Sequence, residues 1–325
     1  MSTAIITLNQ ILIIFIIIAI GALCYKVKLI DDKTNDKLSS ILLMLVNPVV
    51  IFVSYQREFE SDLLEGLLIS LLLALITHIV SIIISYFLIK KKKRKIEYLD
   101  DKKIKKYVDN DDVEVERMGS IYANVGFMGI PLMNGIFGSE GVFYATASIT
   151  IFNIFLWTHG IIMISGDKDF NLKSMLKRLS SPSIIAIVIG LVCFLFQIMV
   201  PDVVFDALQH IANLNTPFAM LIAGVIIAQT DFKKLLTNYR IYFIAFIKLL
   251  LIPILLLLLY SLFPIDYKVL TTAVILAGAP TATTGILFAI RHKKNAIYSA
   301  EIFSVTTLLS SLTIPFIVML AGLFT

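Results

Sequence analysis

The chain has 325 residues, of which 58% are hydrophobic, and its mean hydropathy is +0.90. Soluble domains contain about 45–50% apolar residues. The excess, together with repeated apolar runs of about 20 residues, excludes an ordinary soluble protein and indicates a membrane protein. The net charge of +5 does not indicate a nucleic-acid-binding protein, because the basic residues lie in short loops between the apolar runs.

Ten apolar segments follow one another, and each is long enough to cross a bilayer as a helix. The first is not preceded by Lys or Arg but is followed by Lys26 and Lys28, the reverse of a signal peptide, so we expect it to be retained. The charged stretch 90–117 is too polar to span and predicts a partly flexible cytoplasmic loop. The predicted spans are 4–25, 38–55, 63–89, 118–137, 142–165, 182–200, 203–228, 241–263, 269–290 and 296–324.

The distribution of positive charge predicts how the chain is oriented. All of the 28 Lys and Arg residues except Arg57, Lys248 and Lys268 fall in or next to the five connections after the odd-numbered spans. Cytoplasmic loops are enriched in Lys and Arg. We therefore expect a multi-pass protein of the cell membrane with both termini on the extracytoplasmic side.

Two of the predicted spans contain helix-breaking residues. One includes Gly126, Gly129 and Pro131, and the other, about 150 residues later, includes Gly278 and Pro280. Proline removes a backbone donor and clashes with the preceding turn. Broken backbone is tolerated in a membrane only where it is buried in protein or lines a polar cavity. A pair of interrupted spans, one in each half of a chain, is typical of the binding site of a transporter.

The residues of the two breaks suit an anion. Proline is favoured at the first position of a helix, so Pro131 and Pro280 are each expected to begin a half-helix. The amides that follow would lack acceptors, and the partial positive charge of two such ends would attract a carboxylate. Alternatively, the prolines only kink the helices and the polar residues only pack them. The predicted substrate-binding residues are Asn124, Pro131, Leu132, Met133, Asn134, Gly278, Pro280, Thr281, Thr283 and Thr284.

Other polar residues inside the spans are candidates for coupling or gating. Charged residues are costly in a bilayer and often functional, although a structural ion pair or a side chain that reaches the interface has the same sequence signature. Histidine can relay protons near neutral pH. Asparagines can bind substrate or a cation, or can hold helices together. The candidates are Lys248, Glu301, Asn47, Asn215 and His159.

Rival classes of membrane protein have weaker support. No His-Glu-x-x-His or phosphate-binding loop is present, so the sequence predicts neither an intramembrane enzyme nor an ATP-driven pump, and it indicates no cofactor or metal. A cation/proton antiporter of similar architecture would need carboxylates at the breaks, and neither break has one nearby. An anion channel is a further alternative, because the sequence does not show whether two gates can open at the same time.

Similar residue patterns recur in the two halves in the same order. Asn47-Pro48 in the second span corresponds to Asn215-Thr-Pro217 in the seventh, and Gly129-Ile-Pro131 corresponds to Gly278-Ala-Pro280. With five spans in each half, the second half would enter the membrane inverted. We therefore expect an all-α membrane protein with a first repeat over 1–165, a connecting loop over 166–180 and an inverted repeat over 181–325.

The stretch from Asn124 to Gly138, with Met-Gly-Ile-Pro-Leu at its middle, resembles the auxin efflux carrier family, which includes plant PIN carriers and bacterial malate and malonate permeases. Ser304 to Pro315 near the end of the chain is also similar. The resemblance implies two inverted five-helix repeats whose broken helices cross at their prolines, an organic anion at the crossing near Asn124, and a homodimer. Where many relatives have Asn-Pro at the start of the sixth span, this chain has Ser181-Pro182-Ser183.

These observations predict a secondary transporter. Its substrate would be a small organic anion, such as a dicarboxylate or an auxin-like carboxylate, moved by alternating access between the two repeats. The expected partners are this substrate and the lipid bilayer, and no nucleic acid.

Overall fold

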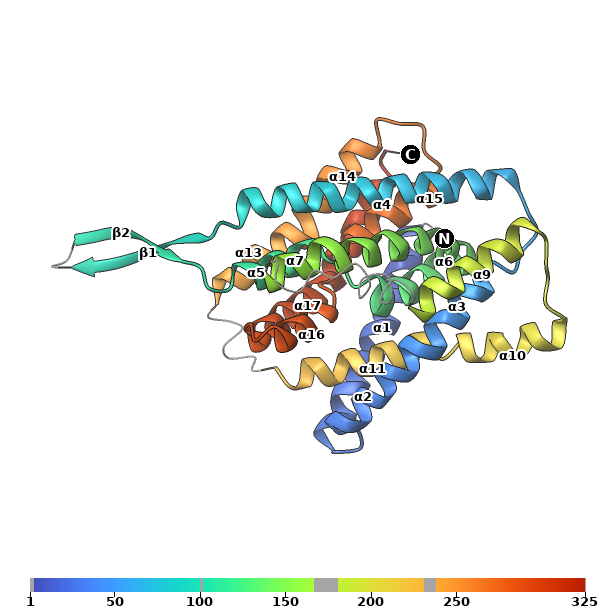
Figure 1. Ribbon diagram of the computed structural model, residues 1–325, viewed down its shortest axis with the longest axis horizontal. Helices are drawn as coiled ribbons and strands as arrows, with labels where there is room; N and C mark the ends of the chain where they lie inside the picture. The colour runs from blue at the N-terminus through green and yellow to red at the C-terminus, as the bar shows by residue number, and fades with distance from the viewer. Residues whose placement is uncertain (1–2, 100–101, 167–180, 231–237, 325) are drawn as a thin grey trace.

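The computed structural model describes residues 3–99, 102–166, 181–230 and 238–324, so most of the connecting loop 166–180 lies outside the described residues. Long helices run roughly side by side and make up most of this part of the chain (Figure 1). Four π-helical turns interrupt them: η1 (Leu42–Val46), η2 (Val125–Gly129), η3 (Leu156–Gly160) and η4 (Ile247–Leu251). The α-helices are α1 (Thr3–Lys26), α2 (Asp32–Ile41), α3 (Asn47–Ser54), α4 (Ser61–Leu88), α5 (Val113–Ile121), α6 (Ile130–Phe155), α7 (Ile161–Ser165), α9 (Pro182–Leu195), α10 (Asp202–Ala212), α11 (Asn215–Ala228), α13 (Tyr239–Phe246), α14 (Ile252–Tyr260), α15 (Tyr267–Ala277), α16 (Thr284–Arg291) and α17 (Ala296–Ala321).

The helices have the length and surface of a membrane protein. Seven helical segments in the described part of the chain are long and apolar enough to cross a bilayer, and α9 and α15 are shorter apolar helices. Large apolar side chains such as Ile16, Ile83 and Leu312 are 60%, 62% and 73% exposed. Extended apolar surface is rare on soluble monomers, whereas a bilayer solvates it. The protein is therefore an integral membrane protein that crosses the bilayer several times.

The long segment Val125–Ser165 contains a chain reversal, so its 41 residues are two helices rather than one. The reversal occurs at Gly138, where φ is 62° and ψ is −151°, a backbone conformation that side chains with a Cβ atom rarely adopt. The two helices then run close together, since a Cβ atom on Gly141 would lie 2.7 Å from the carbonyl oxygen of Met133. The boundary expected between spans 118–137 and 142–165 is therefore confirmed.

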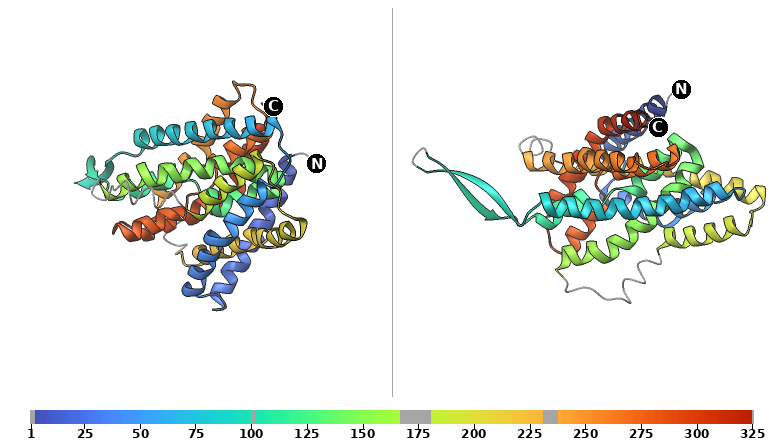
Figure 2. Two further views of the ribbon diagram at one scale, coloured as in Figure 1. Left: turned by 45° about the vertical axis from the view of Figure 1, so that its right-hand side comes forward. Right: turned by 90° about the horizontal axis from the view of Figure 1, so that it is seen from above.

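The charged stretch 90–117 differs from the loop expected there. Strands β1 (Lys92–Leu99) and β2 (Lys102–Asp109) pair as an antiparallel hairpin, in which Lys92 is opposite Asp109. The hairpin projects from one end of the helices (Figure 2). The last residues of the stretch, from Val113, form the start of α5 and are buried except for Glu114. The expectation of a loop through residue 117 was wrong because Glu116 and Arg117 have partners that allow charged side chains to be buried in a helix.

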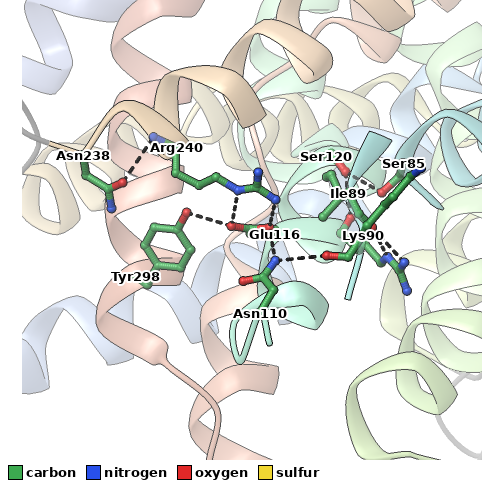
Figure 3. A network of polar contacts seen from close by, with 10 residues as sticks. Ser85, Ile89, Lys90, Asn110, Glu116, Ser120, Asn238, Arg240 and Tyr298 are labelled. Atoms are coloured by element: carbon green, nitrogen blue, oxygen red, sulfur yellow. Dashed lines mark hydrogen bonds and ion pairs between the residues drawn. The ribbon is translucent and has the colours of Figure 1, made fainter. Parts of the chain in front are cut away.

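Glu116 is the centre of a polar network that joins the two halves of the chain (Figure 3). Its carboxylate is 1% exposed and accepts two hydrogen bonds from the Arg240 guanidinium of α13, both 2.7 Å long. It also accepts hydrogen bonds from Tyr298 of α17 at 3.3 Å and from Asn110 beside the hairpin at 2.8 Å. A buried carboxylate needs such partners, so this network fixes the start of α5 against the second half.

Helices α1 and α11, which come from different halves, cross in close contact at two glycines. A Cβ atom on Gly21 would lie 2.5 Å from the carbonyl oxygen of Leu221, and one on Gly224 would lie 2.2 Å from the carbonyl oxygen of Ile18. Small residues let membrane helices approach until their backbones touch, which increases the van der Waals contact between them. The absence of side chains at these two positions therefore sets the distance between α1 and α11.

We expect Gly224→Ala to lower the thermal unfolding temperature of the purified protein in detergent, because its methyl group would overlap the backbone of α1 and overpacking costs about 1–3 kcal/mol. Gly322→Ala is the matched control, since its methyl group would meet no atom closer than 3.5 Å. Equal unfolding temperatures for the two variants would contradict the close contact.

Candidate functional site

The two broken spans meet through a short piece of antiparallel β-structure. Helix α5 ends at Ile121 and α15 ends at Ala277, and the extended residues after each helix pair with one another. The amide of Asn124 donates to the carbonyl oxygen of Pro280 at 2.8 Å, and the amide of Ala282 donates to the carbonyl oxygen of Tyr122 at 2.9 Å. These two bonds satisfy backbone groups that would otherwise be unpaired inside a membrane.

The first break lies before the position that the sequence predicted. The half-helix after it begins with η2, and Asn124 is its N-cap, accepting a hydrogen bond from the Phe127 amide at 3.3 Å. Pro131 does not begin this half-helix but is the second residue of α6, and the amides of Leu132, Met133 and Asn134 lie within the helix. In an α-helix the ring of a proline clashes with the carbonyl four residues earlier. The wider π-helical turn before Pro131 leaves more room for it.

The second break also differs from the expectation. Pro280 lies in the extended stretch between α15 and α16, and the second half-helix begins later, at Thr284. The extended stretch is held by Thr281, whose hydroxyl donates to the Gly119 carbonyl at 2.7 Å and whose amide donates to the Thr306 hydroxyl at 3.1 Å. Pro280 therefore ends one half-helix instead of starting the next, because its ring disfavours the helical conformation of the residue before it.

Several hydrogen-bond donors at the two half-helix N-termini lack a partner in the described part of the chain. They are the backbone amides of Gly126, Thr283 and Thr284, and the side-chain amide of Asn124, which is 3% exposed. The hydroxyl of Thr284 is buried and unpaired as well. Each N-terminus carries a partial positive charge. Unpaired donors and positive helix ends together can bind the oxygen atoms of an anion.

These N-termini line one cavity of about 310 Å³. Apart from the breaks, its wall comes from the second span, the sixth span and the helix after Gly138. Among the described residues that line the cavity none is charged, and three are aromatic. The lining residues are Leu43, Met44, Asn47, Ala123, Asn124, Val125, Gly126, Phe127, Ile130, Ile149, Phe152, Asn153, Leu156, Trp157, Ser181, Pro182, Ser183, Ala282, Thr283 and Thr284.

The cavity brings together some of the predicted substrate-binding residues and not others. Asn124, Thr283 and Thr284 line it. The other predicted residues do not: those of α6 are buried among neighbouring helices except for Asn134, which is exposed, and Gly278, Pro280 and Thr281 are buried at or next to the pairing of the two breaks. The residues outside the cavity are Pro131, Leu132, Met133, Asn134, Gly278, Pro280 and Thr281.

Two of the predicted coupling residues form a polar contact beside the cavity. Asn215 donates a hydrogen bond of 2.7 Å from its side-chain amide to the side-chain oxygen of Asn47, which itself lines the cavity. Both side chains are buried, with 3% and 2% of their surface exposed. The pair therefore joins the second span to the seventh at the level of the breaks.

The remaining coupling candidates lie outside the cavity. Lys248 in η4 is 1% exposed and donates to the Ala277 carbonyl at 3.0 Å, so it does not reach the membrane interface. His159 lies between two tyrosines, with Nδ1 2.9 Å from the Tyr122 hydroxyl and Nε2 3.3 Å from that of Tyr86. Glu301 lines a polar depression near the network of Glu116. Their proposed roles in coupling remain predictions.

The sequence did not indicate several residues of the cavity wall. The side chains of Asn153 and Trp157 belong to the helix after Gly138, and Ser183 belongs to α9. Trp157 is the single tryptophan of the chain and lies in a π-helical turn, a feature that often marks functional positions. Ser181 and Ser183 had been noted only as a difference from the auxin efflux carrier pattern.

Comparison with known proteins supports a role in transport. The model of the membrane transport protein family matches residues 108–175 and 167–318, which together make up more than half of the chain and include both breaks. An uncharacterized transporter, YfdV, of Escherichia coli strain K12 is 26% identical over 176 residues. The same protein in Shigella flexneri gives the same identity. The match covers 51% of this chain and 55% of these relatives, so the chain spans about half the length of the curated relatives it matches.

The family match covers both half-helix N-termini that line the cavity, and the described helices have the surface of a multi-pass membrane protein. The chain belongs to the membrane transport protein family, whose members are similar to auxin efflux carriers.

Proposed function

We propose that the protein is a secondary transporter that moves a small organic anion across the cell membrane. One observation carries the proposal: two half-helix N-termini with unpaired amides line the same cavity, and none of the described residues around that cavity is charged. A carboxylate bound there would accept hydrogen bonds from Asn124 and from the amides near Thr283 and Thr284. A cation/proton antiporter would need a carboxylate at this position, so the composition of the wall favours an anion.

We further propose two inverted repeats of five spans, residues 1–165 and 181–325, that alternate access to the cavity. The antiparallel pairing of the two breaks supports the proposal, because it relates one broken span to the other by an approximate two-fold rotation. The reversal at Gly138 supports a separate fourth and fifth span. The start of α1 and the end of α17 lie toward the same end of the helices (Figure 2), as an even number of spans would require. The positive charges favour the extracytoplasmic side for both ends.

The cavity wall favours a monocarboxylate with an apolar body over a dicarboxylate. The unpaired backbone amides and the side-chain amide of Asn124 belong to the two breaks, whereas Phe127, Phe152 and Trp157 contribute aromatic surface. No Lys or Arg among the described lining residues would pair with a second carboxylate, and an unpaired buried charge is costly. A volume of about 310 Å³ is at the lower end of the range of small-molecule sites. An arylacetic acid combines the required charge, apolar body and small size.

We expect Asn124→Asp to reduce uptake of an arylacetic acid into proteoliposomes by about tenfold or more, since a tenfold loss corresponds to only ~1.4 kcal/mol and the new carboxylate would repel the substrate. Asn134→Asp is the matched control, because the same change occurs at an exposed residue outside the cavity. Similar uptake by the two variants would contradict an anion site at Asn124.

Trp157 provides a direct measurement of binding. Because it is the single tryptophan and lines the cavity, we expect phenylacetate to change its fluorescence at lower concentrations than malonate or malate. Trp157→Phe should abolish the signal and serves as the control for effects on the detergent or lipid. Tighter binding of malonate than of phenylacetate would contradict the proposed monocarboxylate preference.

A further inference from the structure

The C-terminal end of a half-helix has the opposite electrostatic character to the N-terminal ends that line the cavity. Its last carbonyl groups lack intrahelical partners and carry a partial negative charge. In transporters with broken helices, such carbonyl groups and unwound backbone commonly hold the coupling cation. In this protein α15 ends at Ala277, immediately before the second break, and its carbonyl oxygen is therefore in the position of a cation ligand.

A side chain of the protein already occupies this position. The Nζ atom of Lys248 lies 3.0 Å from the Ala277 carbonyl oxygen and donates a hydrogen bond to it. Lys248 belongs to η4, between α13 and α14, and its immediate neighbours Ile247 and Leu249 are buried as well. Only 1% of the Lys248 surface is exposed, so its ammonium group is held away from solvent and lipid headgroups.

Lys248 forms no ion pair with a carboxylate in the described part of the chain. Glu116 is bound to Arg240, Glu114 to Lys294 and Glu140 to Lys268. A charge inside a membrane protein costs free energy unless it is paired or solvated. The interaction that can offset this cost is the one with the negative end of α15.

We propose that Lys248 is a built-in cation that replaces a coupling Na⁺ at the crossing, so that the protein binds its anion without Na⁺. The inference rests on the proposed function for its link to transport. The position of the ammonium group is independent of that function. Lys248 is in this view a positioning residue: it neutralises the C-terminal end of α15 and keeps the extended stretch after Ala277 in place beside the cavity.

The test measures thermal unfolding of the purified protein in NaCl, NH₄Cl and choline chloride at equal ionic strength. The wild-type unfolding temperature should be the same in all three salts. Lys248→Ala should unfold at a lower temperature in choline, and Na⁺ or NH₄⁺ should raise that temperature in a saturable way, because a ligand that binds the folded state stabilises it. Lys268→Ala, which removes an exposed lysine paired with Glu140, should show no such dependence on the cation.

A neutral replacement distinguishes the effect of the charge of Lys248 from the effect of its hydrogen bond. It also keeps the proposal testable if the alanine variant does not fold. Lys248→Gln retains a donor for the Ala277 carbonyl but has no charge, so we expect it to fold and to lose anion binding measured by Trp157 fluorescence. Wild-type-like binding by Lys248→Gln would overturn the proposal. So would a saturable stabilisation of the wild type by Na⁺, or a Lys248→Ala variant that is as stable as the wild type and insensitive to cations.

The outcomes distinguish this inference from the proposed function. If no carboxylate is bound or transported but Lys248→Ala is stabilised by small cations, the proposed anion site is contradicted and the role of Lys248 as a built-in cation is supported. If phenylacetate binds and its uptake by the wild type requires Na⁺, the anion site stands and the role of Lys248 is wrong.

Discussion

Inside a bilayer every backbone amide and carbonyl must find a partner within the protein, and the crossing of the two broken spans depends on how this requirement is met. Two hydrogen bonds between Tyr122–Asn124 and Pro280–Ala282 satisfy part of the interrupted backbone. Lys248 satisfies the carbonyl of Ala277. The amides that remain unpaired belong to residues that line the cavity, so the same interruption that would be costly elsewhere would supply the donors for the proposed anion.

The sequence was sufficient to predict the membrane class, the transporter family and the presence of two breaks. The lengths of the apolar runs and the distribution of Lys and Arg are set by the bilayer itself, so both can be interpreted without knowledge of tertiary contacts. The boundary between the spans 118–137 and 142–165 was also predicted from the apolar runs, whereas the positive φ of Gly138 that makes the reversal was not. Asn124, Thr283 and Thr284, which the sequence predicted to bind substrate, line one cavity in the structure.

The exact positions of the breaks could not be predicted, because tertiary contacts decide them. Proline marks a discontinuity but can precede it, follow it or lie in the next helical turn, and Pro131 and Pro280 differ in this respect. The hydrogen bonds of Thr281 to Gly119 and Thr306 involve residues that are distant in sequence. The start of α5 was missed for a similar reason, since the charge of Glu116 is compensated by Arg240 from the other half.

Because the chain reverses at the single residue Gly138, the connection between the half-helix that carries Asn124 and the helix that carries Trp157 is very short. The two helices are in close contact near Gly141, which restricts how far either can slide past the other. We therefore expect Asn124 and Trp157 to keep their spacing during any rearrangement that exposes the cavity to one side or the other. A bound molecule would contact the same surface of these two helices on entry and on release, and only the opposite wall of the cavity would have to move.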